Sequence, residues 1–313
     1  MIERIPASDR ATWLKLRERD VTASAAAALL GAHPFMTPFE LWQLKAGKIS
    51  EDPEISPAME RGTLLEPVAV KLLQSRRPDW TVKHNSGRDQ VYWRDPERRI
   101  GATPDVLIDD DGVFGIVQIK SVEPMVFREK WLLDGKLGTP ASWVVEPPLY
   151  VVIQALVEAK LTGAQAAYVA PLVVMHGLEM PLVPVPIHEG AWDRVVDEVS
   201  SFWASIAAGE EPEPDWRKDA ALLNELGRTD NGREIDLTGD NMMPDLLERR
   251  LAAKDRIKAD EAIVEECDGE IIAKLGEFER AHVPGWSLKR PTIKRKAYEV
   301  KASSYRRLDI KRL

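Results

Sequence analysis

The chain has 313 residues and a single cysteine, Cys267. One cysteine excludes an intramolecular disulfide, a zinc ribbon and a four-cysteine iron–sulfur cluster. No apolar run reaches the roughly 18 residues that a membrane helix needs, and the first twenty residues mix acidic and basic side chains where a signal peptide has an apolar stretch. We therefore expect a protein of the reducing cytoplasm with no membrane partner.

Several signatures of common enzymes are also missing. Neither Gly-Lys pair is followed by Ser or Thr, so there is no P-loop, and no GxSxG elbow, HExxH helix or dinucleotide fingerprint occurs. The five histidines never fall at the spacing of zinc ligands. These absences leave carboxylates, amides and lysine as the groups available for chemistry.

Charge is distributed unevenly along the chain. Residues 286–313 hold ten of the 43 Lys and Arg but two of the 51 Asp and Glu, a local net charge of +8. Residues 1–285 keep 33 basic and 49 acidic side chains, a net charge of −16. An acidic body with a basic tail favours an anionic partner such as nucleic acid, although a solvated pair of basic strands would have the same composition.

Hydrophobic periodicity predicts helices first and strands afterwards. Apolar spacing and caps indicate helices within residues 8–32, in two pieces, and over 37–46 and 58–76, all before any strand. Three strands, a helix, two strands and a closing helix then follow: 80–92, 100–108 and 115–121, then 148–161, 166–175, 180–185 and 192–208. This order is typical of an α/β or α+β domain over residues 1–205, with a mixed central sheet flanked by helices.

The rest of the chain has a different pattern. Residues 206–243 are acidic and contain proline, which indicates a linker region. Residues 244–281 are again helical in pattern, with apolar residues seven apart that need a partner from this chain or from a second helix. Residues 244–313 are therefore predicted to form a helical extension with a basic tail, in which weak alternation after Trp286 indicates a terminal hairpin.

One group of polar residues falls on two neighbouring predicted strands. GATPD (101–105) ends in Asp105, and QIK brings Gln118 and Lys120 thirteen to fifteen residues later. Strand side chains alternate between faces, so Gln118 and Lys120 point the same way, and pairing around a turn at 109–112 places Asp105 opposite them. An ordinary cross-strand pair is the alternative, but a lone amide inside the apolar run VFGIVQI favours a functional site.

These groups suit a hard divalent cation. Mg²⁺ takes oxygen ligands, and the chain can supply them from Asp105, the amide of Gln118, the main-chain carbonyl of Ile119, and Glu66 in RGTLLEP. Lys120 would then stand beside a water molecule that attacks a phosphate.

A second polar group lies near the N-terminus. Arg17 precedes the Ala-rich helix that starts near Thr22, so its guanidinium and the Ser24 hydroxyl can meet on one anion. The alternative is that Arg17 pairs with a nearby acid such as Asp20.

Five segments, taken together, carry a family resemblance: RERDVTAS (17–24), RGTLLEP (61–67), GATPD (101–105), GIVQIK (115–120) and YVVIQ (150–154). Over about residues 10–205 the chain resembles the YqaJ-type viral recombinases, relatives of phage lambda exonuclease in the PD-(D/E)xK nuclease superfamily. Each segment is short, but five in the family's order and at about its spacing are specific. The resemblance implies a restriction-endonuclease-like core.

The resemblance also implies an activity. It is that of a Mg²⁺-dependent nuclease, with Mn²⁺ as a substitute, that degrades one strand of linear duplex DNA from its 5′ end. In such enzymes the metal is bound by the residues that match Glu66, Asp105 and Gln118. The residue that matches Lys120 serves the attacking water, and the one that matches Gln154 supports the site.

Further expectations follow from the same resemblance. The residues that match Arg17 and Ser24 hold the terminal 5′ phosphate of the DNA. Relatives assemble into a ring around DNA and act beside a single-strand annealing protein in phage recombination. A phage or prophage origin, with action in the cytoplasm of a bacterial host, is therefore expected.

Gln118 departs from the family pattern, in which Glu is most common. An amide contributes an oxygen but no charge, so metal would bind more weakly, or one ion would bind where a relative holds two. A DNA-end-binding module without catalysis is accordingly one alternative function, and an endonuclease of the same superfamily is another. The presence of Glu66 and Lys120 favours catalysis, and the pair Arg17 and Ser24 favours an exonuclease.

Overall fold

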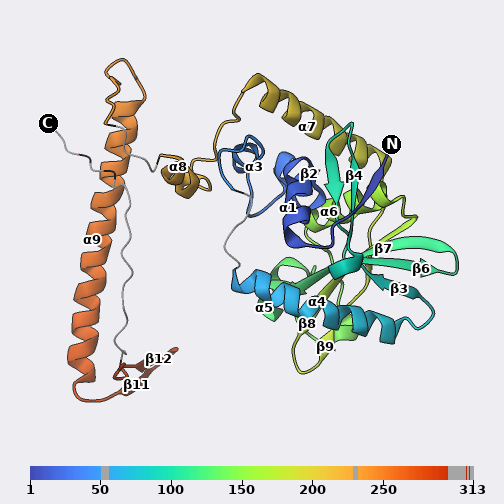
Figure 1. The fold of residues 1–313 in the computed structure, drawn as a ribbon. Coiled ribbons are helices and arrows are strands. Elements are labelled where there is room, and N and C mark those ends of the chain that lie inside the picture. The colour runs from blue at the N-terminus through green and yellow to red at the C-terminus, as the bar shows by residue number, and fades with distance from the viewer. Residues whose placement is uncertain (51–55, 228–231, 295–307, 309, 311–313) are drawn as a thin grey trace. The chain divides into compact units, whose positions relative to one another are not determined.

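The computed structural model describes residues 1–50, 56–227, 232–294, 308 and 310 (Figure 1). The chain divides into two compact units, residues 1–227 and residues 228–313. Among the described residues, no helix has the length and apolar character needed to cross a membrane. The limits predicted for the nuclease domain, the linker and the extension stay predictions.

The centre of the first unit is a mixed sheet in which β8 and β7 are parallel and the other neighbours are antiparallel. Its strands run in the order β10 (Val183–Pro184), β8 (Ala166–Val174), β7 (Val113–Val122), β6 (Val106–Asp110) and β3 (Thr81–His84), with β9 (Leu178–Glu179) also on β8. The predicted turn between β6 and β7 is confirmed. Asp111 and Gly112 both have positive φ, as a two-residue hairpin loop requires.

Helices cover both faces of this sheet (Figure 1). The face with Ile116 packs against α6 (Leu149–Thr162) and α5 (Pro124–Lys130), while the face with Val117 packs against α4 (Pro57–Arg76). The alternation of apolar residues along β7 therefore serves two cores, one on each side. The predicted α+β class, with a restriction-endonuclease-like core of helix, antiparallel meander, crossover helix and parallel strand, is confirmed.

A smaller sheet has the order β1 (Glu3–Pro6), β4 (Val91–Asp95), β5 (Ile100–Ala102) and β2 (Val21–Thr22). Two expectations were therefore wrong. Strands occur before the helices, and the strands predicted over 80–92 and 100–108 are each divided between the two sheets. The cause is Asn85, whose side chain bonds the main chain of Val91 and the carbonyl of Pro104 and so holds both crossing points.

The N-terminal helices form where predicted. Helix α1 (Arg10–Glu18) is capped by Asp9, whose carboxylate accepts a hydrogen bond from Thr12 N at 2.9 Å. Helix α3 (Pro38–Lys45) is capped by Thr37 and has proline at its first position.

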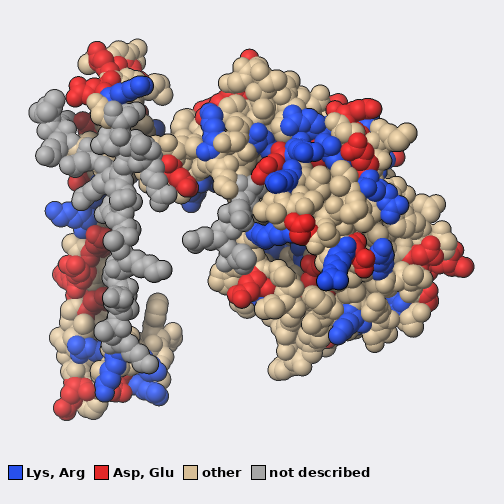
Figure 2. Space-filling view, viewed as in Figure 1, with Lys and Arg blue, Asp and Glu red and all other residues tan. Residues whose placement is uncertain are grey.

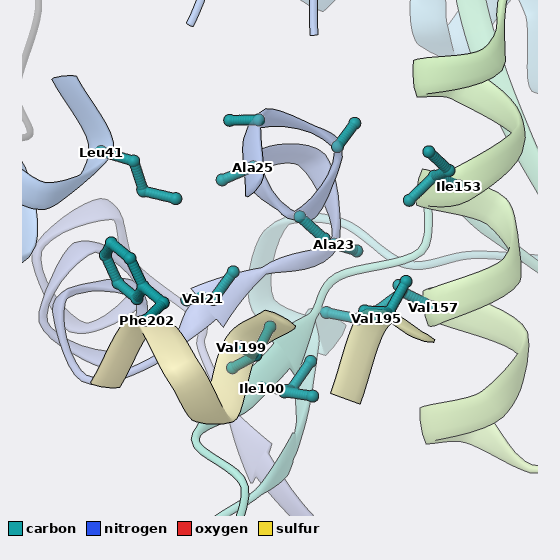
Figure 3. Close-up of a cluster of buried hydrophobic side chains, with 14 of the residues drawn as sticks. Val21, Ala23, Ala25, Leu41, Ile100, Ile153, Val157, Val195, Val199 and Phe202 are labelled. Carbon is teal, nitrogen blue, oxygen red and sulfur yellow. The ribbon is translucent and has the colours of Figure 1, made fainter. Parts of the chain in front are cut away.

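Alanines bring α2 (Ala23–Leu29) against two other helices. Five alanines of α2 are buried, and Ala23 and Ala25 belong to one apolar cluster with Ile153 of α6 and Val199 of α7 (Glu189–Ala208) (Figure 3). Small side chains let the helix axes approach closely. This packing fixes the N-terminal segment next to α6, which carries Gln154.

The segment after α7 is tied to the same unit. Asp219 is buried and accepts a hydrogen bond from Thr37 Oγ1 at 2.7 Å and from Asp215 N at 2.8 Å. It directly precedes α8 (Ala220–Leu226). Part of the segment predicted as a linker is therefore folded onto the first unit.

The second unit contains one long helix and a hairpin. Helix α9 (Met243–Leu275) runs through Gly269 without a break, and β11 (Arg280–Val283) pairs with β12 (Trp286–Lys289). The hairpin therefore begins earlier than the one predicted after Trp286. Most of the basic tail, residues 295–307, 309 and 311–313, lies outside the described residues.

Gly101 provides a test of the smaller sheet. A Cβ at this position would lie 1.8 Å from the hydroxyl oxygen of Tyr92, a fully buried side chain that donates to Asp20. Gly101→Ala should lower the free energy of unfolding by about 2 kcal/mol, since the clash displaces a buried hydrogen-bonded ring. Urea denaturation measures this. Gly62→Ala, in α4 with open space around it, should instead leave stability equal or higher.

Candidate active site

The site begins where one strand of the sheet continues beyond its neighbour. The last pair between β6 and β7 joins Val106 to Val117, yet β7 continues to Val122 with β8 as its partner. The open edge of β7 is occupied by Asp105, the residue directly before β6. Its Oδ2 accepts from Ile119 N at 2.8 Å. The predicted convergence of Asp105 with the end of this strand is thus present.

Gln118 and the Ile119 carbonyl join Asp105 at this edge. Gln118 Nε2 donates to Asp105 Oδ2 at 2.5 Å and to the Ile119 carbonyl at 3.3 Å. In a strand the N–H and C=O of one residue point to the same side, so this carbonyl also faces the open edge. Among the described residues, Gln118 Oε1 is buried and has no hydrogen-bond partner. The amide therefore has a free acceptor beside a carboxylate.

Glu66 reaches the cleft from α4 and is held by a histidine. His84 Nε2 lies 2.6 Å from Glu66 Oε1, and Ser86 Oγ lies 3.0 Å from His84 Nδ1. The register of β3 places His84 opposite Val106, next to Asp105. Sequence reasoning missed His84 because only the strand register, which no local pattern reveals, brings it there.

Lys120 is linked to helix α6. Lys120 Nζ donates to Gln154 Oε1 at 2.8 Å, and Gln154 Nε2 donates to Glu158 Oε1 at 2.8 Å. Gln154 therefore links Lys120 to Glu158, and the supporting role predicted for it stays a prediction. Glu158 was not anticipated from the sequence, although a lone acid inside the apolar helix pattern was a signal.

Arg17 and Ser24 border the same cleft. The cleft has a volume of about 550 Å³, and its walls include every predicted site residue: Arg17, Ser24, Glu66, Asp105, Gln118, Ile119, Lys120 and Gln154. Arg17 and Ser24 also line a neighbouring cleft of about 770 Å³ beside α3 and α8. They therefore stand between the two hollows.

Trp13 orients Arg17. The guanidinium carbon of Arg17 lies 4.4 Å from the centre of the Trp13 ring, and Trp13 Nε1 donates to Thr103 Oγ1 at 3.0 Å. Asp20, the alternative partner considered for Arg17, accepts from Arg94 through both carboxylate oxygens and from Tyr92. Arg17 is thus held against the Trp13 ring at the border of the cleft.

Burial gives this site unusual acidities. Burial and the nearby charge of Glu66 raise the pKa of Asp105 from 3.8 to about 7, against the opposing effect of Lys120 and the Ile119 N–H. Burial, together with Asp105, raises the pKa of Glu158 well above its ordinary value. Asp105 therefore keeps its proton to a higher pH than an ordinary aspartate does, unless a cation joins it.

The donor set suits a hard cation with few charged ligands. Two carboxylates, one amide oxygen and one main-chain carbonyl all offer oxygen, which Mg²⁺ and Mn²⁺ prefer. Within the described residues, no three His, Cys, Asp or Glu side chains are placed to hold a metal together. That agrees with an amide at position 118, because Gln118 stands where a third carboxylate would complete the set.

Comparison with known proteins identifies the family. The YqaJ-like viral recombinase domain matches residues 12–165, a stretch that contains every residue of the cleft described above. Residues 12–165 form a YqaJ-like viral recombinase domain. The chain is also 25% identical over 279 residues to the uncharacterized protein YqaJ of Bacillus subtilis (strain 168), covering 86% of this chain and 79% of that protein.

Solved structures are similar to this chain at low identity. An alkaline exonuclease from Laribacter hongkongensis has 22% identity and a TM-score of 0.47, covering 68% of this chain and 99% of its own. A putative exonuclease from Eubacterium rectale has 13% identity and a TM-score of 0.44, covering 75% of this chain and 97% of its own.

The raised pKa of Asp105 in the YqaJ-like domain predicts how stability depends on pH without metal. Between about pH 4 and pH 7 folded Asp105 keeps a proton that the unfolded chain has released, so stability falls as pH rises through this window. Asp105→Asn has no titrating carboxyl group at this position, so it should not lose stability in this way as the pH rises. In EDTA the variant should exceed the wild type at pH 8 by on the order of 2 kcal/mol and by much less at pH 4, as urea unfolding measures. An equal difference at both pH values would contradict the assignment.

Proposed function

We propose that the protein is a metal-dependent exonuclease that degrades one strand of linear double-stranded DNA from the 5′ end. The observation that carries this proposal is that one cleft gathers an oxygen donor set, a lysine and an arginine–serine pair. The donor set can hold a divalent cation, the lysine can serve a water molecule, and the arginine–serine pair can bind a phosphate. Together these are the parts that hydrolysis at a DNA end needs.

Mg²⁺ is the proposed cofactor, with Mn²⁺ as a substitute. Asp105, Glu66, the Ile119 carbonyl and the amide oxygen of Gln118 would hold it. Gln118 Oε1, which has no hydrogen-bond partner in the described residues, would supply the amide oxygen once the Gln118 side chain had turned. The cation would neutralise charge on the phosphate and lower the pKa of water. Because Gln118 adds no charge, one ion per site is the expected load.

Lys120 would orient the attacking water. Its ammonium is fixed by Gln154 and lies two residues from Gln118 on the same face of β7. It can hold a water beside the scissile phosphate and take part in transfer of its proton. Asp105 and Lys120 thus have different tasks, since one fixes the cation and the other serves the nucleophile.

Arg17 and Ser24 would bind the terminal 5′ phosphate. A terminal phosphate carries more charge and more acceptor oxygens than an internal diester, so a guanidinium beside a hydroxyl favours it. In the view of Figure 2, Lys and Arg of residues 1–227 are mixed with Asp and Glu rather than collected into one basic stripe. Local contacts such as this pair would therefore contribute much of the recognition of a DNA end.

The biological setting is part of the proposal. The description of the family as viral recombinases supports a role in phage-type recombination, in which the exposed single strand passes to a single-strand annealing protein. We propose action in the cytoplasm of a bacterial host, with a ring of several copies around DNA.

A DNA-end-binding module without catalysis is the second candidate. The observation that favours it is the hydrogen bond from Gln118 to Asp105, which a cation would have to replace. Lys120 favours the enzyme, because a binding module needs no lysine fixed beside the carboxylate edge. An endonuclease of the same superfamily is less well supported, since Arg17 and Ser24 would have no end to bind.

Asp105→Ala and Lys120→Ala should each reduce strand degradation by at least about a hundredfold without unfolding the chain. The physical reason is loss of a cation ligand in one variant and of the group that serves the water in the other. Release of nucleotides from end-labelled linear duplex with Mg²⁺ measures both. Asp89→Ala and Lys83→Ala, which remove exposed charges of the same kind, are the matched controls. Wild-type rates in either site variant would remove that residue from the mechanism.

Arg17→Ala should erase most of a preference for 5′-phosphorylated over 5′-hydroxyl linear duplex, while slow hydrolysis continues because the carboxylate edge is intact. The loss of a charge-assisted contact corresponds to about a tenfold change or more. Initial rates on the two duplexes give the ratio, and Arg88→Ala, an exposed arginine in the same unit, is the control. A variant that keeps the full ratio, or a wild type that cuts closed circles rapidly, would point to an endonuclease.

A further inference from the structure

Glu158 is a buried acid that the proposed reaction does not use. Glu158 is 1% exposed, and most of the other buried residues of its helix, α6, are apolar. Burial of a carboxyl group is costly, and a leucine would fill the same space without this cost. A specific task is therefore needed to explain the acid.

The contacts of Glu158 lead to Gln154. The two residues lie one turn apart on α6, and Gln154 Nε2 donates to Glu158 Oε1 at 2.8 Å. A glutamine amide has a donor end and an acceptor end of nearly equal shape, so it can be turned either way round. The carboxyl group offers Gln154 an acceptor, which holds the donor end of the amide toward Glu158.

This orientation determines what Lys120 meets. With Nε2 turned to Glu158, Oε1 of Gln154 points to Lys120 and accepts from Nζ at 2.8 Å. The reversed amide would present an N–H₂ group to an ammonium, which is repulsive. Lysine also has a long flexible side chain, so one well-placed acceptor restricts its position considerably. In either protonation state Glu158 keeps an oxygen that accepts from Gln154.

Two other tasks for Glu158 fit less well. A direct metal ligand would need a set of carboxylates close together, and among the described residues no such set of three exists. A purely structural role would satisfy both oxygens, yet Oε2 is buried without a hydrogen-bond partner in the described part of the chain. Within the described part of the chain, the hydrogen bond that its side chain makes is the one with Gln154.

We propose that Glu158 is a positioning residue, which fixes the amide of Gln154 and through it places the ammonium of Lys120 for hydrolysis. The catalytic part of this inference rests on the proposed nuclease function. The hydrogen bonds that link Glu158 through Gln154 to Lys120 do not depend on that function, so they can be tested separately.

The kinetic test compares three variants of the full chain on 5′-phosphorylated linear duplex. Glu158→Leu should lower kcat about 10- to 100-fold with KM and Mn²⁺ affinity unchanged, because binding groups are untouched. Glu158→Gln, which still offers an oxygen to Gln154, should keep kcat within about threefold. Gln154→Leu should lower kcat as Glu158→Leu does, and the double variant should lose no more than either single one.

A structural readout does not require activity. In the wild type, the side-chain amide protons of Gln154, assigned by their absence in Gln154→Leu, should exchange slowly with solvent in nuclear magnetic resonance spectra. Slow exchange should persist in Glu158→Gln and be lost in Glu158→Leu. If Glu158→Leu does not fold, Glu158→Met, which is unbranched and of similar length, takes its place.

The outcomes distinguish a failure of the positioning role of Glu158 from a failure of the proposed nuclease function. Wild-type kcat in Glu158→Leu, additive losses in the double variant, or unchanged amide exchange would overturn the positioning role. A loss of Mn²⁺ affinity in Glu158→Leu would overturn it in favour of a direct effect on the cation. Absence of Mg²⁺-dependent hydrolysis by the wild type would instead contradict the proposed function. The exchange measurement would still decide whether the hydrogen bonds from Glu158 through Gln154 to Lys120 are present.

Discussion

The open edge of β7 is the constraint on which the site depends. Because β6 begins at Val106 while β7 continues to Val122, the main chain of Ile119 has no strand partner on that side in the described part of the chain. Asp105 takes the place of that partner and bonds the Ile119 N–H. The Asp105 carboxylate, the Ile119 carbonyl and the Gln118 amide therefore meet through backbone geometry. The sheet thus provides the position, the open edge of β7 at Ile119, and the side chains of Asp105 and Gln118 provide the chemical groups.

Packing on both sides of the sheet determines what reaches this edge. Helix α4 covers one face and brings Glu66, while α6 covers the other and brings Gln154. The small residues of α2 allow it to lie against α6, so Arg17 and Ser24 border the same cleft (Figure 3). Polar groups from the N-terminal segment, one helix on each face and the central strands are thereby collected around one hollow. Its high polarity is tolerable because most of these groups are hydrogen-bonded.

The sequence was sufficient for features that depend on local pattern. Periodicity and caps predicted α3, α4, α6 and the turn at Asp111 and Gly112, and strand alternation predicted the meeting of Asp105 with Gln118. It was insufficient where distant residues decide. The division of the predicted strands between two sheets depends on Asn85, and the roles of His84 and Glu158 depend on register and on helix packing. No window of neighbouring residues contains that information.

The central claim is that the edge formed by Asp105, Gln118 and Ile119 holds a divalent cation. The most direct measurement is a crystal structure of the protein soaked in Mn²⁺, with anomalous scattering to locate the ion. The account predicts one ion bound by Asp105, Glu66 and the Ile119 carbonyl, with the Gln118 amide turned so that its oxygen faces the ion. Absence of an ion at saturating Mn²⁺, with Gln118 still donating to Asp105, would contradict the account.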